Sequence, residues 1–341
     1  MIYLVNNSNN PYFNLAFEEY CLSELASGTD DSTYFILWQN APAVIIGKHQ
    51  DAYQEVDLAY AHEQGIQLVR RITGGGAVYH DLGNLNISIM GRYSQHPNYA
   101  EEYGEAVCEA LRQVGLKGVE MNGRNDLYVD GKKVSGWAKR IQGDAFLLHG
   151  TLLYDVDLDQ LVRVLQTKES KMQKKTAVQS VRSVVQNIRE LLPYPNLEAL
   201  RQALEKIMRG NDERISLSEE SVAHINELVE KKYQTDQWIY HLTFEPTLTK
   251  SFHTCCGYIV LNVLLSENEP PSHSASPRQS YLEAIQFKGD FLGNKDTEEL
   301  SNLLKGVAWN EVALREALTA VHIDDYFTGL SNEAFIQLVK P

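Results

Sequence analysis

The stretch RRITGGGAVYHDLGNLN, Arg70 to Asn86, places three consecutive glycines between two arginines and a run that resembles a strand. Each glycine loses more backbone freedom on folding than any other residue. An ordinary turn needs only one glycine or an Asn-Gly pair. The tripled glycine therefore indicates either a glycine-rich bulge or turn, or a ligand that comes close to the backbone.

The glycine segment matches neither of the familiar nucleotide-binding patterns. No Lys-Ser/Thr pair follows it, as a P-loop requires, and its spacing differs from the dinucleotide fingerprint. Its neighbours favour a ligand, because Arg70 and Arg71 offer cationic donors for a carboxylate or phosphate. Asn84 and Asn86 add amides on the next predicted strand. Bare backbone beside arginines suits a slender, partly apolar, anionic ligand.

Composition limits the class of protein. The 341 residues carry a formal net charge of −14, with 43% hydrophobic and 22% charged residues, as in ordinary globular proteins. This length favours two domains. The acidic balance argues against nucleic acid and anionic membranes as partners. We expect a cytoplasmic protein, because the sequence shows no signal peptide or transmembrane segment and its four cysteines suggest free thiols.

The order of predicted elements is mixed α+β. Residues 34–40 and 41–50 read as paired strands, and Asp130-Gly131 between alternating runs predicts a hairpin. Helices are expected over 10–25, 99–114 and in three segments between 157 and 235, with a further strand over 239–244. The Pro/Ser-rich stretch 266–280 should join two strands of one small sheet.

A second cluster of polar residues lies in GRNDLYVDGKKVSGWAKR, residues 123–140. Asn125 and Asp126 could face a metal-nucleotide, with Asp126 as an oxygen ligand of Mg²⁺, or could form an Asx turn. Strand alternation places Lys133 and Ser135 on one face and Val134 on the other. A lysine on an inner face would stabilise developing negative charge, whereas one on an outer face would only be solvated.

Two further features allow two interpretations each. His149 lies between apolar runs just before Gly150. It is either a core residue whose hydrogen bonds are satisfied or part of a functional site. A basic segment is either a solvated helix face or a mobile flap over a phosphate. Its cationic residues are Lys168, Lys171, Lys174, Lys175, Arg182 and Arg189.

Taken together, these motifs resemble those of bacterial lipoate–protein ligases with an accessory C-terminal domain, in the biotin/lipoate ligase superfamily. The resemblance runs nearly end to end, through NPYFNLAFEEY, LWQNAPAVIIGKHQ, the two segments above, HGTLL, SVRSVVQN, GDFLGNKD and DDYFTG. It implies an α+β fold with a biotin/lipoate-ligase-like catalytic domain, residues 1–246, of mixed, mostly antiparallel sheets with flanking helices. A small α/β accessory domain, residues 247–341, would follow.

The resemblance also implies a chemistry. Lipoate and ATP, with Mg²⁺, would give lipoyl-AMP and pyrophosphate, and a lysine of an acceptor would then take the lipoyl group. The acceptor would be an E2 lipoyl domain or a glycine-cleavage H-like protein. Lys133 matches the catalytic lysine. The implied lipoate and lipoyl-AMP contacts are Arg70, Arg71, Thr73, Gly74, Gly75, Gly76, Val78, Asn84, Ser135, Gly136 and His149. The implied ATP and Mg²⁺ contacts are Asn125, Asp126, Lys133 and Arg182, with Asp126 as the metal ligand.

Two departures from the family pattern bear on substrate and partner choice. Trp137 stands where relatives usually have a small residue, and Val184 where they often carry a second arginine. Three rival functions remain. A lipoyl or octanoyl amidotransferase needs a cysteine thiolate, and Cys108 lies within a predicted helix. A biotin ligase normally has arginines inside its glycine loop. A non-catalytic acceptor-binding paralogue would keep only the fold.

Overall fold

The computed structural model describes residues 1–122, 126–165, 185–240, 244–268 and 279–341. The chain forms two compact units. The first comprises Met1–Ile46, Ala52–Ile72 and Ala77–Tyr240, and the second comprises Gly47–Asp51, Thr73–Gly76 and His241–Pro341. The sequence-based boundary between 246 and 247 falls close to the end of the first unit. Two short segments from the N-terminal part of the chain nevertheless belong to the second unit.

An eight-stranded sheet forms the centre of the first unit, in the order β11-β1-β2-β6-β10-β9-β8-β7. The pairs β1–β2 and β1–β11 are parallel and the other pairs are antiparallel. The mixed, mostly antiparallel sheet predicted for this part is therefore confirmed. Its strands are β1 (Ile2–Val5), β2 (Tyr34–Trp38), β6 (Asn84–Arg92), β7 (Val119–Asn122), β8 (Asp126–Val129), β9 (Lys132–Gln142), β10 (Ala145–Leu153) and β11 (Arg214–Ser216).

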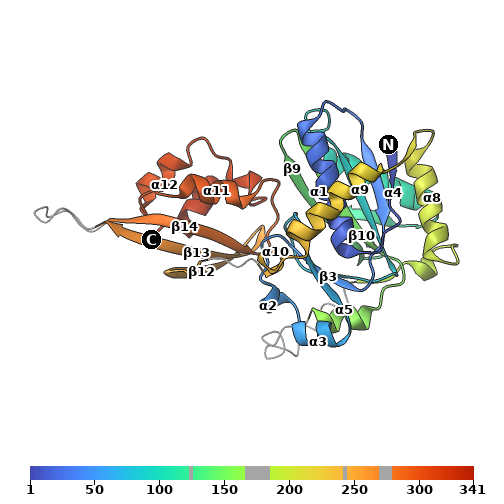
Figure 1. The fold of residues 1–341 in the computed structure, drawn as a ribbon, viewed down its shortest axis with the longest axis horizontal. Helices are drawn as coiled ribbons and strands as arrows, with labels where there is room; N and C mark the ends of the chain where they lie inside the picture. Colours follow the sequence, from blue (N-terminus) through green and yellow to red (C-terminus); the bar gives the residue numbers. More distant parts are fainter. Residues whose placement is uncertain (123–125, 166–184, 241–243, 269–278) are drawn as a thin grey trace, which may run out of the picture. The chain divides into compact units, whose positions relative to one another are not determined.

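Helices cover both faces of this sheet (Figure 1). Helices α4 (Tyr99–Gln113) and α8 (Leu197–Arg209) share one core cluster with Phe146 and Leu148 of β10. Helices α1 (Pro11–Ser27) and α9 (Glu219–Leu228) share the other cluster with Leu147. Alternate residues of β10 thus face opposite cores, as the period of a strand requires.

Local sequence signals explain where several elements begin and turn. Helix α1 starts after Asn10, whose side chain accepts hydrogen bonds from the backbone N–H groups of Tyr12 and Phe13. The predicted hairpin between β8 and β9 is confirmed, with positive φ at Asp130 (51°) and Gly131 (76°). The shorter helical elements are α2 (Ala52–Glu55), α3 (Leu58–Glu63), α5 (Leu158–Val164), a 3₁₀ turn (Arg189–Leu191), a π-helical turn (Val229–Tyr233) and α10 (Asp236–Tyr240).

The predicted pairing of residues 34–40 with 41–50 is wrong. Strand β3 (Ala43–Ile46) belongs to a separate three-stranded sheet, in which it lies between β4 (Gln67–Arg70) and β5 (Val78–His80). The reason is that both edges of β2 are already paired, one with β1 and the other with β6. No edge of β2 is left for the next strand along the chain.

The second unit contains an antiparallel sheet with the order β12-β13-β14. The predicted strand over 239–244 is wrong in part, because Ile239 and Tyr240 end helix α10 and residues 241–243 lie outside the described part. The predicted connection between two strands of one small sheet is confirmed by the pairing of β13 with β14. The elements are β12 (Leu248–Thr254), β13 (Gly257–Asn268), β14 (Gln279–Gly289), α11 (Thr297–Leu304), α12 (Glu311–Ala317), a 3₁₀ turn (Ile323–Asp325) and α13 (Asn332–Val339).

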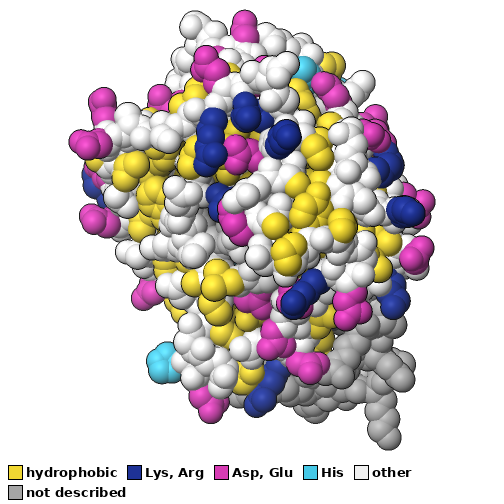
Figure 2. Space-filling model, turned by 90° about the vertical axis from the view of Figure 1, so that its right-hand side faces the viewer, with side chains coloured by type: hydrophobic (Ala, Val, Ile, Leu, Met, Phe, Trp, Pro, Cys, Tyr) yellow, Lys and Arg dark blue, Asp and Glu magenta, His cyan; other side chains and the backbone are white. Residues whose placement is uncertain are grey.

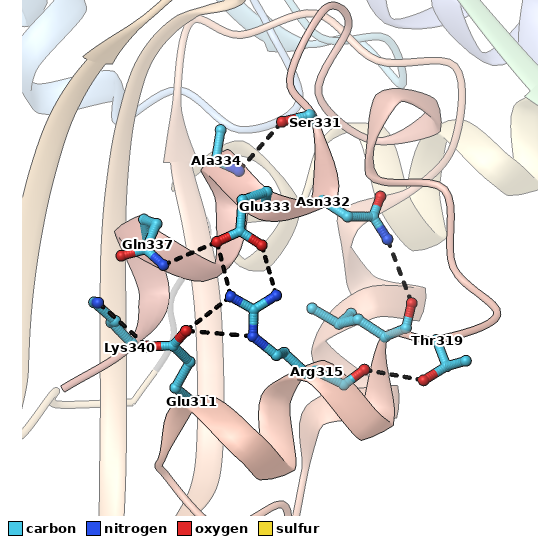
Figure 3. A network of polar contacts seen from close by, with 10 residues as sticks. Glu311, Arg315, Thr319, Ser331, Asn332, Glu333, Ala334, Gln337 and Lys340 are labelled. Carbon is cyan, nitrogen blue, oxygen red and sulfur yellow. Dashed lines mark hydrogen bonds and ion pairs between the residues drawn. The ribbon is translucent and has the colours of Figure 1, made fainter.

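An exposed ion network joins two helices of the second unit (Figure 3). The guanidinium of Arg315 on α12 donates to Glu311 at 2.7 Å and to Glu333 on α13 at 2.5 Å. Lys340 contacts Glu311 at 3.3 Å. The network holds the two helices at the surface, while Leu314, Phe335 and Ile336 bury their apolar sides in the core.

In the described part of the chain, no helix combines the length and apolar character needed to cross a membrane. Of the four cysteines, Cys21, Cys108 and Cys256 are buried and Cys255 is exposed. Figure 2 shows one face of the protein, where basic side chains gather around acidic ones and apolar side chains lie scattered between them. The net charge of −14 therefore does not make this face uniformly acidic.

Candidate functional site

A buried carboxylate lies between α1 and the central sheet of the first unit. Glu18 is 1% exposed and accepts hydrogen bonds from Ser88 of β6 at 2.5 Å and from His149 of β10 at 2.9 Å. Ser88 in turn accepts the indole N–H of Trp38 at 2.7 Å. The predicted site residue His149 is thus held in place by a helix residue that lies 131 positions earlier in the chain.

A buried cation lies in the same polar region. Arg71 is 6% exposed and donates to the carbonyl of Ile45 at 3.1 Å. Burial lowers the pKa of Arg71 to about 10, and the Glu18 carboxylate opposes that shift. The guanidinium therefore stays charged at neutral pH and can bind an anion.

The second arginine of the predicted pair has a different environment. Arg70 is fully buried, and its guanidinium donates to the carbonyls of Trp238 and Ile239 at 2.9 and 2.6 Å. The Trp238 indole returns a hydrogen bond to the Arg70 carbonyl at 2.9 Å. These contacts bind β4 to the end of α10, which favours a structural role for Arg70 and leaves its expected contact with lipoate a prediction.

Buried polar atoms without hydrogen-bond partners mark two of the predicted site residues. Asn84 donates to Asn86 at 3.0 Å, but its own carbonyl oxygen has no partner in the described part of the protein. The hydroxyl of Ser135, which is 1% exposed, is in the same situation. Leaving such groups unpaired costs free energy, so they are suited to receive a ligand.

The predicted catalytic lysine forms an ion pair with the predicted metal ligand. Lys133 Nζ lies 2.7 Å from an Asp126 oxygen, and their side chains are 31% and 23% exposed. A Cβ placed on Gly136 would lie 3.1 Å from Lys133 Nζ, so this glycine leaves space for the lysine. The pair is ordered yet reachable from solvent, as a group that meets a nucleotide must be.

The predicted alternation over Lys133, Val134 and Ser135 is wrong, because β9 contains a bulge. The register shifts so that Leu127 faces Ser135 while Tyr128 faces Lys133, which leaves Val134 as the extra residue. Val134 and Trp137 consequently share one core cluster, while Lys133 lies on the face of Gly136.

The same bulge determines where Trp137 packs. Its indole covers Gly150, where an added Cβ would come within 2.4 Å of the ring. Trp137 is 5% exposed and lies in the core that contains α4 and α8, whereas the neighbouring His149 faces Glu18 of α1. This departure from the family pattern therefore packs on the face opposite the Glu18 carboxylate.

The three glycines belong to the second unit and differ from one another. A Cβ on Gly74 would lie 2.6 Å from the carbonyl oxygen of Phe291. Gly75 has a φ of 90° and donates its N–H to the same carbonyl at 2.9 Å. Gly76 is exposed, and a Cβ there would meet nothing within 4 Å. Two glycines thus allow close backbone packing, and only Gly76 leaves open space.

The other predicted residues are placed as follows. Thr73 is buried and accepts the N–H of Lys48 through its carbonyl at 2.8 Å, and Val78 pairs with Ile45. Asn125, Lys168, Lys171, Lys174, Lys175, Arg182 and Val184 lie outside the described residues. Arg189, the last cation of the predicted flap, forms an exposed ion pair with Asp155.

Two buried residues were not identified from the sequence as members of the site. Glu18 interrupts the apolar stripe of α1 that Leu15 and Leu22 continue, and an acid in such a stripe was a usable signal. His80 is 3% exposed, and burial together with Arg71 and His149 lowers its pKa to about 3. Nothing in the sequence HDLG distinguishes it from a surface histidine.

A metal ion would have few protein ligands here. Among the described residues, no group of three or more His, Cys, Asp and Glu could hold one. The single carboxylate of Asp126 fits Mg²⁺ only if triphosphate oxygens supply most of its ligands, which is the usual arrangement for this ion at nucleotide sites.

Two family models match parts of the chain. Residues 10–209 match the lipoyl protein ligase A/B catalytic domain, and residues 275–339 match the bacterial lipoate protein ligase C-terminus. The lipoate-protein ligase LplJ of Bacillus subtilis is 33% identical over 99% of this chain and 100% of its own length.

Solved structures extend the comparison. The Plasmodium falciparum LipL1 in complex with lipoate superimposes with a TM-score of 0.73 at 20% identity, covering 94% of each chain, which shows the fold. A lipoate-protein ligase A bound with ATP has a TM-score of 0.59 at 30% identity, covering 71% of this chain and 98% of its own. A bi-partite ligase from Thermoplasma acidophilum, described together with its E2 lipoyl domain, has a TM-score of 0.62 at 30% identity and covers 72% of this chain and 98% of its own.

Proposed function

The chain belongs to the lipoate–protein ligases, and from this premise we propose that it activates lipoate with ATP and transfers the lipoyl group to a lysine of an acceptor protein. The observation that carries the proposal is the ion pair of Lys133 with Asp126, which is partly exposed beside Gly136. Related structures that are 30% identical, one with bound lipoic acid and one bound with ATP, support the two substrates.

The first half-reaction would form lipoyl-AMP. A carboxylate oxygen of lipoate bonds to the α-phosphorus of ATP, while the bond to the bridging oxygen breaks and pyrophosphate leaves. Negative charge grows on the phosphoryl oxygens in this step, and the Lys133 ammonium would stabilise it. Mg²⁺, held by Asp126 and the triphosphate, would neutralise part of the charge on ATP when bound. Arg71 supplies a buried cation for the lipoate carboxylate.

The second half-reaction would transfer the acyl group. The amine of the acceptor lysine bonds to the acyl carbon, the bond to the phosphate oxygen breaks, and AMP leaves while the amine loses a proton. Charge now develops on the acyl oxygen as well as on the phosphate, so one fixed lysine can serve both steps. The backbone at Lys133 is fixed by a hydrogen bond, because its carbonyl accepts the N–H of Gln186 at 3.0 Å.

We propose an E2 lipoyl domain or a glycine-cleavage H-like protein as the acceptor, since a relative is described together with its E2 lipoyl domain. The net charge of −14 would repel an acidic acceptor at long range. Docking would therefore use a local surface of mixed charge, such as the basic side chains that gather in Figure 2.

The amidotransferase alternative is disfavoured by the environment of Cys108. This thiol lies inside helix α4 and is buried in the core, and burial raises its pKa to about 11. A thiol with such a pKa is almost entirely protonated at neutral pH and cannot serve as a nucleophile without a base. A cysteine at this position therefore contributes to packing.

The test is a mass assay of acceptor modification with purified protein, lipoate, ATP and Mg²⁺. We expect modification that requires ATP, and Lys133→Ala should lower the rate of lipoyl-AMP formation by about 10²–10³. Lys132→Ala, on the exposed neighbour in the same hairpin, is the matched control and should leave the rate unchanged. Transfer without ATP from a lipoylated donor, or a full rate in Lys133→Ala, would contradict the proposal.

A further inference from the structure

A chain of buried side-chain amides ends at His80 in the first unit. Asn6 donates to Asn14 of α1 at 2.9 Å, and Asn14 donates to Asn40 at 2.8 Å. The amide of Asn40 lies 3.0 Å from Nδ1 of His80, on β5. All four side chains are at most 5% exposed. No role in the chemistry above requires three amides in a row at this place.

Backbone groups fix the orientation of the first two amides. The oxygen of Asn6 accepts the N–H of Ser8 at 2.9 Å, so its nitrogen faces Asn14. The nitrogen of Asn14 lies 3.0 Å from the carbonyl of Ser8 and 2.9 Å from that of Gln39. Since carbonyl oxygens only accept, the atom of Asn14 near them must be the donating nitrogen.

The orientation of the Asn14 amide determines that of Asn40, which in turn determines which nitrogen of the His80 ring is protonated. The atom of Asn40 that faces the nitrogen of Asn14 must be its oxygen, so the nitrogen of Asn40 faces His80. An amide nitrogen donates and cannot accept, hence Nδ1 of His80 carries no proton. The neutral ring then carries its proton on Nε2.

The resulting N–H has no protein partner. Nε2 of His80 is buried and makes no hydrogen bond in the described part of the chain. The ring lies edge-on to Trp38, with centroids 6.2 Å apart, in the polar region of Arg71 and His149. A buried donor without an acceptor is costly in free energy, so a bound molecule is expected to supply one.

We propose that Asn14 and Asn40 are positioning residues that hold His80 as a neutral Nε2–H donor, and that this N–H binds an acceptor atom of lipoate beside Arg71. The inference rests on the proposed function for the identity of the ligand. A neutral donor orients the substrate without placing a second cation next to the arginine.

The tautomer is tested first, on ligand-free ¹⁵N-labelled protein, by long-range ¹H–¹⁵N correlation of the histidine rings. We expect an unprotonated Nδ1 and a protonated Nε2 for His80, and a shift of the Nε2 signal when lipoate is added. In Asn40→Leu, a mixture of tautomers should appear. A protonated Nδ1 in the wild-type protein, or an Nε2 signal that lipoate leaves unchanged, would overturn the inference.

Binding is tested by calorimetry with lipoate alone. His80→Met should weaken lipoate binding by about 2- to 10-fold. His80→Gln, whose amide nitrogen can reach the place of Nε2, should retain most of the affinity, and the affinity for ATP should stay unchanged in both variants. Equal lipoate affinity in wild type and His80→Met would overturn this inference alone. A wild-type protein that does not bind lipoate would instead contradict the proposed function.

Discussion

The two units differ in how they use polar side chains. In the first, Glu18, Ser88 and His149 form hydrogen bonds in a region with almost no exposure. In the second, Arg315 joins Glu311 and Glu333 at the surface of two helices. Buried polar groups cost free energy unless every partner is present, whereas exposed ion pairs contribute little in either direction. The burial of the first network therefore points to function, and the exposure of the second points to local helix packing.

The largest expected effect follows from removing the buried carboxylate. Glu18→Leu leaves the Ser88 hydroxyl and the His149 ring without their shared acceptor, and should lower the free energy of unfolding by about 2–5 kcal/mol. Denaturant titration measures this loss. Glu18→Gln keeps an acceptor oxygen of the same size and should be less damaging. Equal stability of the leucine variant and the wild type would remove the contrast between the two networks.

A second comparison lies within the glycine segment of the second unit. Gly74→Ala brings a methyl group to 2.6 Å from the carbonyl of Phe291 and should cost about 1–3 kcal/mol of stability. Gly76→Ala meets no atom within 4 Å and should leave stability unchanged. Denaturant titrations of the two variants measure this difference. Equal stability of the two alanine variants would show that the contact with Phe291 does not constrain Gly74.

The pH dependence of stability separates the buried His80 of the first unit from the exposed network of the second. The pKa of His80 is lowered to about 3 from an ordinary 6.5, so the unfolded chain binds the proton first as pH falls below 6.5. His80 should then reduce stability by about 1.4 kcal/mol for each pH unit between 6.5 and 3. Denaturant titrations at pH 7, 6 and 5 measure this slope. His80→Gln should remove the part of the slope that His80 causes.

The exposed network loses its contribution in a more acidic range. Arg315 lowers the pKa of Glu333 to about 2 from 4.5, so this contribution is present above pH 4.5 and is lost as pH falls from 4.5 to 2. A stability loss between pH 6.5 and 5 that is the same in wild type and His80→Gln would show that other groups cause it.

The smallest effect is expected at the surface of the second unit. Arg315→Ala removes an exposed pair of ionic contacts and should shift the thermal midpoint by about 2 °C or less. The lipoyl transfer rate should stay unchanged. Differential scanning calorimetry at pH 7 measures the shift. A loss of stability comparable to that of Glu18→Leu would show that exposure does not predict how much a network contributes to stability.

Several features could be derived from the sequence because they depend on neighbours in the chain. Asp130 and Gly131 adopt the positive φ values that their hairpin requires. Asn10 begins helix α1 as an N-cap does. The order and spacing of the motifs indicated the family, which the comparisons confirm. The carboxylate of Asp126 and the ammonium of Lys133, both named from motifs, do lie together on adjacent strands.

Other features could not be derived, because they depend on which strand edges and backbone segments meet. Strand β3 does not pair with β2, whose two edges are taken by β1 and β6. The bulge at Val134 reverses the expected faces of β9, since a register shift has no fixed sequence signal. The sequence does not distinguish Gly74 from Gly76. In the structure they differ, because only Gly74 packs against the carbonyl of Phe291.

The sequence by itself determined the α+β class, the family and the charged residues that we propose for the reaction, since local propensity and motif spacing depend on neighbours in the chain. Only the tertiary structure decided which arginine lies beside Glu18, which face Trp137 covers and which amide lies against Nδ1 of His80. The physical reason is that hydrogen bonds and burial are set by groups far apart in sequence. The Glu18 carboxylate and the His149 ring meet across 131 positions of the chain.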